Sequence, residues 1–552
     1  MSAPTYPRVR STRWLLLAAF AVPLYFAFCT NHLWEDFFIT YRVSQNLVHG
    51  HGLVFQPGEH VHTFTSPLGV LLPALCSWVV GGHNDPAAIW LFRVLCSGFL
   101  AASMALVLRL TRHLQLGTAG MVATVGLFLL DAKISDFTSD GMETAIVLFF
   151  FLWTMLALIE ERGRMLRLGI GVAGLLWSRP DGFVFAGAMI VGFGVFDWFA
   201  VKETTGRRNY LRSLIAALVL GGVIYLPWFV WAWHYYGSPI PNTILAKSAG
   251  VGGEGVAGIL QYVPRLLGGN AWITRIFMPS NYMLGGWGEM LFGFSCVLTI
   301  PATLYFLLPR ANRVGRAMSL SLFLGGIYLE SIPQFPWYYP WWQVLALLVD
   351  GAIVSDLFAA CARLAAHSPG LAVRYRRGLG AFVGALLAVQ LGVWCCSAVQ
   401  MQLNQRIIED GVRRPIGEWL HAHARPGDTV MTEPLGYFGY YSQLKMLDWP
   451  GLSAPEMTRA IKEGINSWPA LIEHFQPDWV VFRPREVKAV LAKDEKAFRA
   501  EYQFQFAMDA RSRIAAHRFY PGRDFAMYDS VFMVYRRVTP RRTEVGAVAG
   551  TR

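Results

Sequence analysis

The chain has 552 residues, of which 54% are hydrophobic and only 15% are charged. A soluble globular protein carries about 25% charged residues, so this composition excludes that class and predicts a polytopic α-helical membrane protein. The net charge of +12 does not indicate a nucleic-acid partner, because the basic residues stand in short clusters between apolar runs rather than on one tail or face. We therefore expect membrane lipid, and no nucleic acid, as a partner.

Apolar runs of roughly membrane-spanning length recur along the first 400 residues, allowing for tilt and for interruption by Gly or Pro. Basic residues precede the first run and no small-residue cleavage site follows it, so we interpret it as an uncleaved first span. We predict about eleven spans, over residues 14–30, 87–108, 118–132, 142–159, 168–178, 183–199, 213–236, 286–308, 317–332, 338–361 and 379–400.

The basic clusters between these runs predict the topology. They all fall on the side of the N-terminus if the apolar segment 66–82 lies along the membrane interface instead of crossing it, as the positive-inside rule requires. We therefore place the N-terminus inside and the first loop, residues 31–86, outside with interfacial helices. The same outer face is expected to carry the irregular segments 131–141, 236–285 and 332–337.

From about residue 401 the composition becomes polar. This tail of roughly 150 residues is long enough for its own core, so we divide the chain into a transmembrane domain, residues 1–400, and an extracytoplasmic α/β domain, residues 401–552. Short apolar runs predict buried strands in the tail, and helical periodicity predicts helices. The strands are expected at 428–432, 445–448 and 479–482, and the helices at 414–424, 455–463 and 486–500.

Two adjacent carboxylates, Glu35 and Asp36, stand where the first span leaves the membrane. Ionisable groups at a membrane boundary are costly to desolvate and indicate a functional site by default. Because neighbouring residues on a helix point about 100° apart, we expect only one of them to face a pocket, where it would act as a general base toward a hydroxyl group. The alternative is that both simply mark the water-facing end of a helix.

Arg179 lies in a short break, residues 178–182, between two apolar runs that together look like a broken hairpin. A membrane protein tolerates such irregular backbone only where it is buried in protein or faces a water-filled cavity. The guanidinium can form a structural pair with Asp181, or it can bind a phosphate through its planar fork. Arg42, two turns after Asp36, is a second candidate for an anion contact, and its alternative is snorkelling to lipid headgroups.

Four further residues are candidates for substrate contacts. Asp140 suits a helix cap, whereas Glu143, one turn into the helix, is the better second carboxylate for a pocket. Lys247 follows a span on the outer side and can pair with a lipid phosphate or stabilise the end of its helix. His62 belongs to a dense histidine group whose spacing does not suit a metal ion, so we keep it as a substrate contact and predict no metal site.

Several runs have an order and spacing that resemble the mycobacterial terminal arabinofuranosyltransferase family and its Gram-negative relatives, within the GT-C superfamily of membrane glycosyltransferases. The resemblance covers nearly the whole chain. The runs are WEDFFITYR at 34–42, GHGLVF at 50–55, TSPL at 65–68, GMETA at 141–145, RPDG at 179–182, PIPNTILAK at 239–247 and YFGYYS…LDWPGL at 437–452.

This resemblance implies a GT-C-like fold in the bacterial inner membrane and transfer of a sugar, arabinofuranose first, from a polyprenyl-phosphate carrier. The acceptor would be a glycan or a protein such as a pilin. The resemblance implies no required cofactor and leaves a divalent cation open. It makes Asp36 the catalytic carboxylate with Glu35 beside it. Glu143 becomes a pocket residue and Arg179 a phosphate contact, and Arg42 and Lys247 are weaker contacts.

Two other functions compete with this reading. The nearer one is transfer of mannose or aminoarabinose on the same fold, because a fold does not fix its substrate. The more distant one is a non-enzymatic transporter or an envelope or flagellar assembly factor. Transporters usually show paired repeats with matching broken helices, whereas this sequence shows one broken pair.

Overall fold

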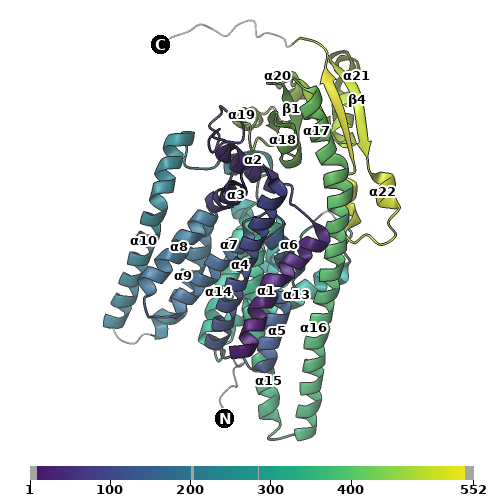
Figure 1. Ribbon diagram of the computed structural model, residues 1–552. Coiled ribbons are helices and arrows are strands. Elements are labelled where there is room, and N and C mark those ends of the chain that lie inside the picture. The colour runs from purple at the N-terminus through teal and green to yellow at the C-terminus, as the bar shows by residue number, and fades with distance from the viewer. Residues whose placement is uncertain (1–8, 201–203, 284, 541–552) are drawn as a thin grey trace.

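The computed structural model describes residues 9–200, 204–283 and 285–540. Each predicted apolar run overlaps a different helix of a long bundle, which confirms the helical membrane fold. The helices are α1 (Val9–Thr30), α4 (Asp85–His113), α5 (Thr118–Leu129), α7 (Thr144–Ile159), α8 (Arg164–Ser178), α9 (Gly182–Ala200), α10 (Thr204–Tyr236), α13 (Glu289–Leu304), α14 (Arg313–Ser331), α15 (Pro340–Leu364) and α16 (Pro369–Asn404) (Figure 1).

The number of spans is smaller when length and apolar character are both required. Within the described residues, six helices are long and apolar enough to cross a membrane, or seven if the bent pair of α5 and α6 (Ala132–Ser139) forms one span. Helices of 15 or 16 residues, such as α8 and α7, reach only about 22–24 Å, less than the about 30 Å of a hydrocarbon core. The total of about eleven spans therefore stays a prediction.

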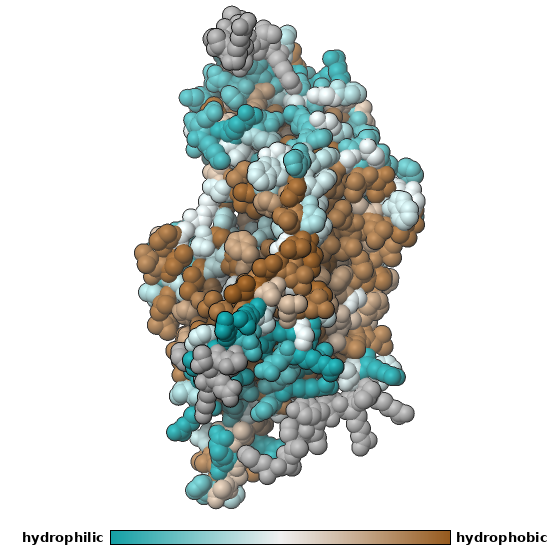
Figure 2. All heavy atoms as spheres, turned by 90° about the vertical axis from the view of Figure 1, so that its left-hand side faces the viewer, coloured by the Kyte–Doolittle hydropathy of each residue, from teal (hydrophilic) through white to brown (hydrophobic). Residues whose placement is uncertain are grey.

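The outer surface of the bundle is apolar. Figure 2 shows a hydrophobic zone between a hydrophilic upper part and a hydrophilic lower end. On α10, Leu211, Ile215, Val219 and Val223 expose about half of their surface each, and residues four apart share one helix face. A continuous exposed apolar face of this length suits lipid and not water. The chain is therefore a multi-pass membrane protein.

The first loop forms two short helices, α2 (Phe37–Val48) and α3 (Pro67–Val79), at the end of the bundle beside the C-terminal domain (Figure 1). Ser66 caps α3 by accepting a hydrogen bond from the Gly69 N–H at 2.8 Å, and Pro67 suits the first helical turn. With 13 residues, α3 is too short to cross a membrane. The remaining short helices before residue 340 are α11 (Asn242–Gly250), α12 (Gly255–Leu267), η1 (Trp272–Arg275), η2 (Tyr305–Leu307) and η3 (Pro336–Tyr338).

The C-terminal domain is an α/β layer built on a five-stranded sheet of order β2-β1-β3-β5-β4. Three parallel strands match the predicted ones: β1 (Thr429–Thr432), β2 (Lys445–Asp448) and β3 (Trp479–Phe482). Two strands that the sequence did not predict, β4 (Tyr502–Asp509) and β5 (Val531–Arg537), complete it in antiparallel pairing. Its helices are α17 (Arg414–His423), α18 (Gly436–Ser442), α19 (Pro455–Lys462), α20 (Trp468–Phe475), α21 (Pro484–Glu501), α22 (Arg511–Ala515) and α23 (Arg523–Tyr528).

Successive strand residues point to opposite faces of the sheet, so each face has its own core. Val430 packs on one face with residues of α17 and α18. Its neighbour Met431 packs on the other face with residues of α19, α20 and α21.

A continuous helix joins the two parts of the chain. α16 runs through the π-helix η4 (Gln405–Arg413) into α17, so helical backbone extends from Pro369 to His423. The predicted boundary at residue 400 therefore falls inside a helix and not in a linker, and the division into two domains stays a prediction.

Candidate active site

A cavity of about 480 Å³ lies between the first loop, the α8–α9 hairpin and α11. Four of the eight predicted site residues line it, namely Asp36, Glu143, Arg179 and Lys247. Leu452 of the C-terminal domain completes its wall. The structure thus gathers polar groups from segments that the predicted topology places on one face of the membrane.

Asp36 stands at the start of α2 with its carboxylate in this cavity. The side chain makes no capping hydrogen bond to α2 and no ion pair among the described residues. The backbone before it is fixed, because the Leu33 N–H donates to Gln405 Oε1 at 3.0 Å and the Trp34 N–H donates to the Asp140 carbonyl at 3.0 Å. A carboxylate that is held in place and left unpartnered is free to accept a proton from a bound hydroxyl group.

Glu35 points away from the cavity, toward α18. Its carboxylate accepts a hydrogen bond from the Gly436 N–H, and a Cβ at Gly436 would lie 2.0 Å from the Glu35 carbonyl oxygen. Burial, together with the neighbouring Asp36, raises the pKa of Glu35 well above its ordinary value. Only Asp36 of the pair therefore faces the cavity, and Glu35 instead ties the first loop to the C-terminal domain.

Arg179 is already neutralised in the cavity wall. Its guanidinium donates to Glu143 at 3.0 Å and to Asp181 at 2.8 Å, and the Tyr328 hydroxyl donates to Asp181 at 2.9 Å. The predicted structural pair with Asp181 is therefore present, and Glu143 adds a second carboxylate. Arg179 still lines the cavity, so it can face a phosphate while its partners hold it in position.

Lys247 differs from Arg179 because no carboxylate compensates its charge. The ammonium group lies 4.6 Å from the centroid of the Phe335 ring and 5.3 Å from that of Trp337, which are cation–π contacts. Within the described residues it forms no ion pair with an acidic side chain. It is therefore the cation of this cavity best placed to bind an anion.

Arg42 does not reach the cavity, so the predicted phosphate contact and the snorkelling alternative are both wrong in this structure. The side chain is 1% exposed. Its guanidinium donates to the carbonyls of Gly439 at 2.9 Å and Leu444 at 3.1 Å, and to Gln56 Oε1 at 3.0 Å. Arg42 thus fastens α2 to the C-terminal domain.

His62 lies behind the cavity wall and not in it. The ring stacks on Tyr236 at 4.5 Å, and burial lowers the pKa of His62 to about 4. Both ring nitrogens lack a hydrogen-bond partner. A neutral, buried ring in this position supports the loop that carries Thr63 into the cavity, and the predicted direct substrate contact is not found.

Asp140 is fully buried outside the cavity. Its Oδ1 accepts a hydrogen bond from the Met142 N–H at 2.9 Å, which holds the turn before α7 rather than a substrate. Burial, with the nearby Asp136, raises the pKa of Asp140 well above its ordinary value. The helix-cap prediction is wrong for Asp140, because the N-cap residue of α7 is Glu143. Asp140 instead belongs to a cluster with His32 and Asp136.

Sequence reasoning missed that cluster and two lining residues. His32 and Asp136 are 104 positions apart, so no local spacing could connect them. Tyr328 lines the cavity from an apolar stretch that carried no separate signal, and Leu452 lines it from the run LDWPGL, which was noted for its resemblance but not for this residue.

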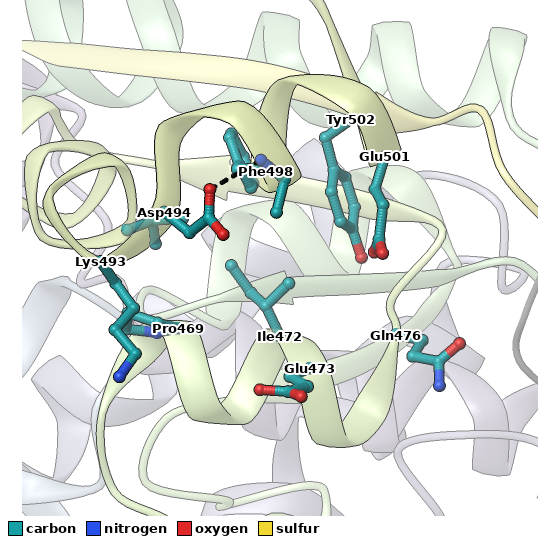
Figure 3. Close-up of a pocket in the computed structure, with 11 residues that line it drawn as sticks. Pro469, Ile472, Glu473, Gln476, Lys493, Asp494, Phe498, Glu501 and Tyr502 are labelled. Carbon is teal, nitrogen blue, oxygen red and sulfur yellow. Dashed lines mark hydrogen bonds between the residues drawn. The ribbon is translucent and has the colours of Figure 1, made fainter.

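A second hollow, of about 230 Å³, lies in the C-terminal domain between α20 and α21 (Figure 3). It shares no lining residue with the cavity of Asp36. Its acidic side chains include Glu473 and Asp494, and Asp494 is used locally, because Oδ1 accepts from the Ala497 N–H at 2.9 Å. The chemistry-bearing residues gather in the larger cavity.

Sequence comparison relates the chain to sugar transferases. It is 27% identical over 259 residues to the terminal beta-(1->2)-arabinofuranosyltransferase of Mycobacterium tuberculosis, covering 44% of this chain and 39% of that protein. It is 29% identical over 238 residues to the same-named protein of Corynebacterium glutamicum, covering 39% and 33%. The match thus spans less than half the length of these relatives. Residues 400–533 match DUF8728, a domain of unknown function.

Three solved structures share the fold. Archaeal oligosaccharyltransferase AglB from Archaeoglobus fulgidus, in complex with an inhibitory peptide and a dolichol-phosphate, matches 91% of this chain and 74% of its own at 11% identity and TM-score 0.56. ArnT from Cupriavidus metallidurans, bound to undecaprenyl phosphate, matches 95% and 98% at 13% identity and TM-score 0.53. Arabinofuranosyltransferase AftD from Mycobacteria matches 97% and 40% at 15% identity and TM-score 0.50.

The chain therefore has the same fold as these three structures, a GT-C-like fold. This likeness in fold agrees with the GT-C-like fold that the sequence motifs predicted. The cavity lies at the end of the bundle next to the C-terminal domain, and both Leu452 and the first loop line it.

Proposed function

We propose that this chain transfers a sugar, arabinofuranose in the first place, from a polyprenyl-phosphate carrier to a hydroxyl group of a glycan or protein acceptor. The reaction takes place on the outer face of the bacterial inner membrane. One observation carries this proposal. The same cavity is lined by a carboxylate without an ion-pair partner among the described residues, Asp36, and by a cation without a carboxylate partner among them, Lys247.

The two groups have complementary tasks. Lys247 binds the donor phosphate, with Arg179 beside it, held by Glu143 and Asp181. Asp36 accepts the proton of the acceptor hydroxyl as its oxygen attacks the anomeric carbon of the sugar. The bond between that carbon and the phosphate oxygen breaks, and the polyprenyl phosphate leaves as an anion with the bonding electron pair.

The comparisons support the donor class. The sequence relatives are named arabinofuranosyltransferases, and the solved AglB and ArnT structures hold a dolichol-phosphate and undecaprenyl phosphate, respectively. The apolar surface of the bundle (Figure 2) suits contact with lipid, which is where the carrier's polyprenyl chain would lie. The acceptor is the less constrained partner, since the C-terminal domain contributes only part of the cavity wall.

The test is sugar release from radiolabelled decaprenyl-phospho-arabinofuranose by the purified protein in lipid, with a mannosyl donor in parallel. We expect Asp36→Asn to lower the rate by about 10²–10⁴-fold, as is typical for loss of a general base. Glu35→Gln is the matched control, because its amide oxygen can still accept the Gly436 N–H, and it should stay within a few-fold of wild type. A folded Asp36→Asn protein with full activity would remove Asp36 from the mechanism. Release from the mannosyl donor alone would change the sugar and keep the site.

A further inference from the structure

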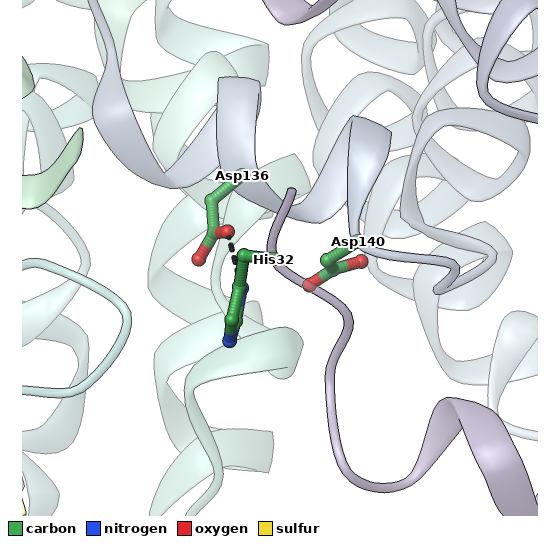
Figure 4. Close-up of side chains that lie close together, drawn as sticks. All are labelled: His32, Asp136 and Asp140. Carbon is green, nitrogen blue, oxygen red and sulfur yellow. Dashed lines mark hydrogen bonds and ion pairs between the residues drawn. The ribbon is translucent and has the colours of Figure 1, made fainter. Parts of the chain in front are cut away.

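A buried cluster of His32, Asp136 and Asp140 lies where the first loop leaves α1 and meets α6. Their side chains are 5%, 1% and 0% exposed. His32 Nδ1 is 3.0 Å from Asp136 Oδ1, and one potential ligand atom from each residue lies within 4.8 Å of the others. Figure 4 shows the two carboxylates on two sides of the His32 ring.

The cluster is separate from the cavity of Asp36. Trp34 lies between them, with its ring centroid 5.2 Å from that of Phe137 and 5.8 Å from that of Trp337. Trp337 lines the cavity, whereas none of the three cluster residues does. A group bound in the cluster would therefore be enclosed by protein and would not touch a substrate.

The cluster leaves hydrogen-bonding capacity unused. Within the part of the chain that the structure describes, the buried Oδ2 atoms of Asp136 and Asp140 have no hydrogen-bond partner. Among the described residues, no Lys or Arg forms an ion pair with either carboxylate. Arg93 interacts electrostatically with Asp140, but its guanidinium donates to the Ser139 and His32 carbonyls and to Asn31 Oδ1 at 2.8–3.0 Å. Buried carboxylates of this kind are normally paired or coordinate a metal ion.

We propose that His32, Asp136 and Asp140 bind a divalent transition-metal cation, Zn²⁺ or Mn²⁺, as a structural site. One imidazole nitrogen with carboxylate oxygens is a ligand set that both cations accept. The free Oδ2 atoms can complete the coordination without water, which disfavours Mg²⁺, because Mg²⁺ normally keeps several waters.

The cation would fix the segment that carries the proposed general base. It would join the end of α1 to α6, and the Trp34 N–H already donates to the Asp140 carbonyl at 3.0 Å, two residues before Asp36. The proposal concerns the fold and does not rest on the proposed transferase function. Its measurements therefore do not depend on activity.

The first measurement is the metal content of the full-length protein, purified in detergent without chelator and analysed by inductively coupled plasma mass spectrometry. We expect about one equivalent of Zn²⁺ or Mn²⁺ per chain. Removal with EDTA should lower the Tm, and adding Zn²⁺ or Mn²⁺, but not Mg²⁺, should restore it, with a shift of ~2 °C or more.

Three variants locate the ion. His32→Gln and Asp136→Asn keep side-chain size and should lose the bound metal together with the metal-dependent Tm shift. Thr138→Ala is the control, because Thr138 is equally buried on α6 and lies outside the cluster. Wild-type protein without bound metal, and with the same Tm in EDTA, Zn²⁺ and Mn²⁺, would overturn the proposal. So would metal that persists in both cluster variants.

Discussion

Two charged regions of this molecule use their charges in opposite ways. At the junction between η4 and the C-terminal sheet, Arg413 and Arg483 both pair with Asp529 at 2.5 Å. Arg413 also pairs with Glu409 at 2.6 Å, and Arg483 with Glu486 at 2.9 Å. In the cavity, Asp36 and Lys247 have no such partners.

This difference distinguishes charges that stabilise the fold from charges that are available to bind a substrate. A buried ion pair with saturated partners has little attraction left for a ligand, and breaking it leaves an uncompensated buried charge. A charge that remains unpaired in a cavity is costly unless a substrate supplies the partner. Arg42 is held in another way: among the described residues it forms no ion pair, and its buried guanidinium donates to two backbone carbonyls.

The largest effect should come from breaking the buried ion-pair network of Arg413, Arg483 and Asp529. Asp529→Asn should lower the free energy of unfolding by about 3 kcal/mol, because two buried guanidinium groups lose a shared carboxylate. Asp509→Asn is the control, since Asp509 pairs only with Arg511 at an exposed position and should cost less than about 1 kcal/mol. Denaturant unfolding of both variants measures the difference. Equal losses would mean that the junction is no more than a surface network.

A smaller effect is expected from replacing Lys247, which lines the cavity and has no carboxylate partner among the described residues. Lys247→Met should raise the KM for the polyprenyl-phosphate donor by about 10-fold, as loss of a charge-assisted contact does, with little change in Tm. Lys445→Met is the control, because Lys445 pairs with Glu59 at 2.7 Å and Glu456 at 3.2 Å and does not line the cavity. Initial rates at varied donor concentration measure both variants. An unchanged donor KM for Lys247→Met would move the phosphate site to Arg179.

The pH dependence of stability sharpens the same contrast. Burial alone would raise the pKa of Asp529, but Arg413 and Arg483 outweigh it and hold the pKa below its ordinary value of 3.8. Asp529 therefore contributes stability above that value, and the contribution is lost as the pH falls through the lower, folded-state pKa. The Tm difference between wild type and Asp529→Asn should be constant from pH 7 to pH ~5 and shrink below pH ~4. A difference that persists unchanged at pH ~3 would contradict the ion-pair account.

Local patterns predicted most of the helices and three of the five strands. The apolar runs matched helices because length and composition are local properties, and the three parallel strands were short buried runs for the same reason. Strand β4 was missed because most of its residues are exposed or half-buried, so it is not a short buried run, and β5 was missed although most of its residues are buried. Asp36, Arg179 and Lys247, which line the cavity, were predicted as site residues because ionisable groups stand out beside apolar spans.

Side-chain direction could not be predicted from the same signals. Arg42 meets carbonyl groups about 400 positions later in the chain, so its burial depends on how the C-terminal domain docks. Asp140 and His62 resembled site residues by their position in the sequence, but both are buried and neither lines the cavity. Asp36 and Glu35 are neighbours in sequence with different partners, and only the three-dimensional contacts of Gly436 separate them.

The smallest expected effect concerns the part of the cavity wall that the C-terminal domain contributes. The loop after β2 is held by Asp448, which accepts from the Leu452 N–H at 2.6 Å, and by Asn242, which donates to the carbonyls of Gly451 and Leu452 at 2.7 and 3.0 Å. Leu452 thereby presents an apolar side chain to the cavity. Because this wall belongs to the domain and not to the bundle, we expect it to contact the acceptor and not the lipid-linked donor.

Leu452→Ala should raise the KM for an added glycan acceptor by about 3-fold, the effect of losing a partial apolar contact, while the donor KM stays unchanged. Leu491→Ala is the control, because Leu491 is also partly buried in the C-terminal domain but does not line the cavity. Transfer rates at varied acceptor and donor concentrations separate the two constants. If Leu452→Ala changed the donor KM instead, Leu452 would lie beside the donor, and the acceptor would have to enter from another side.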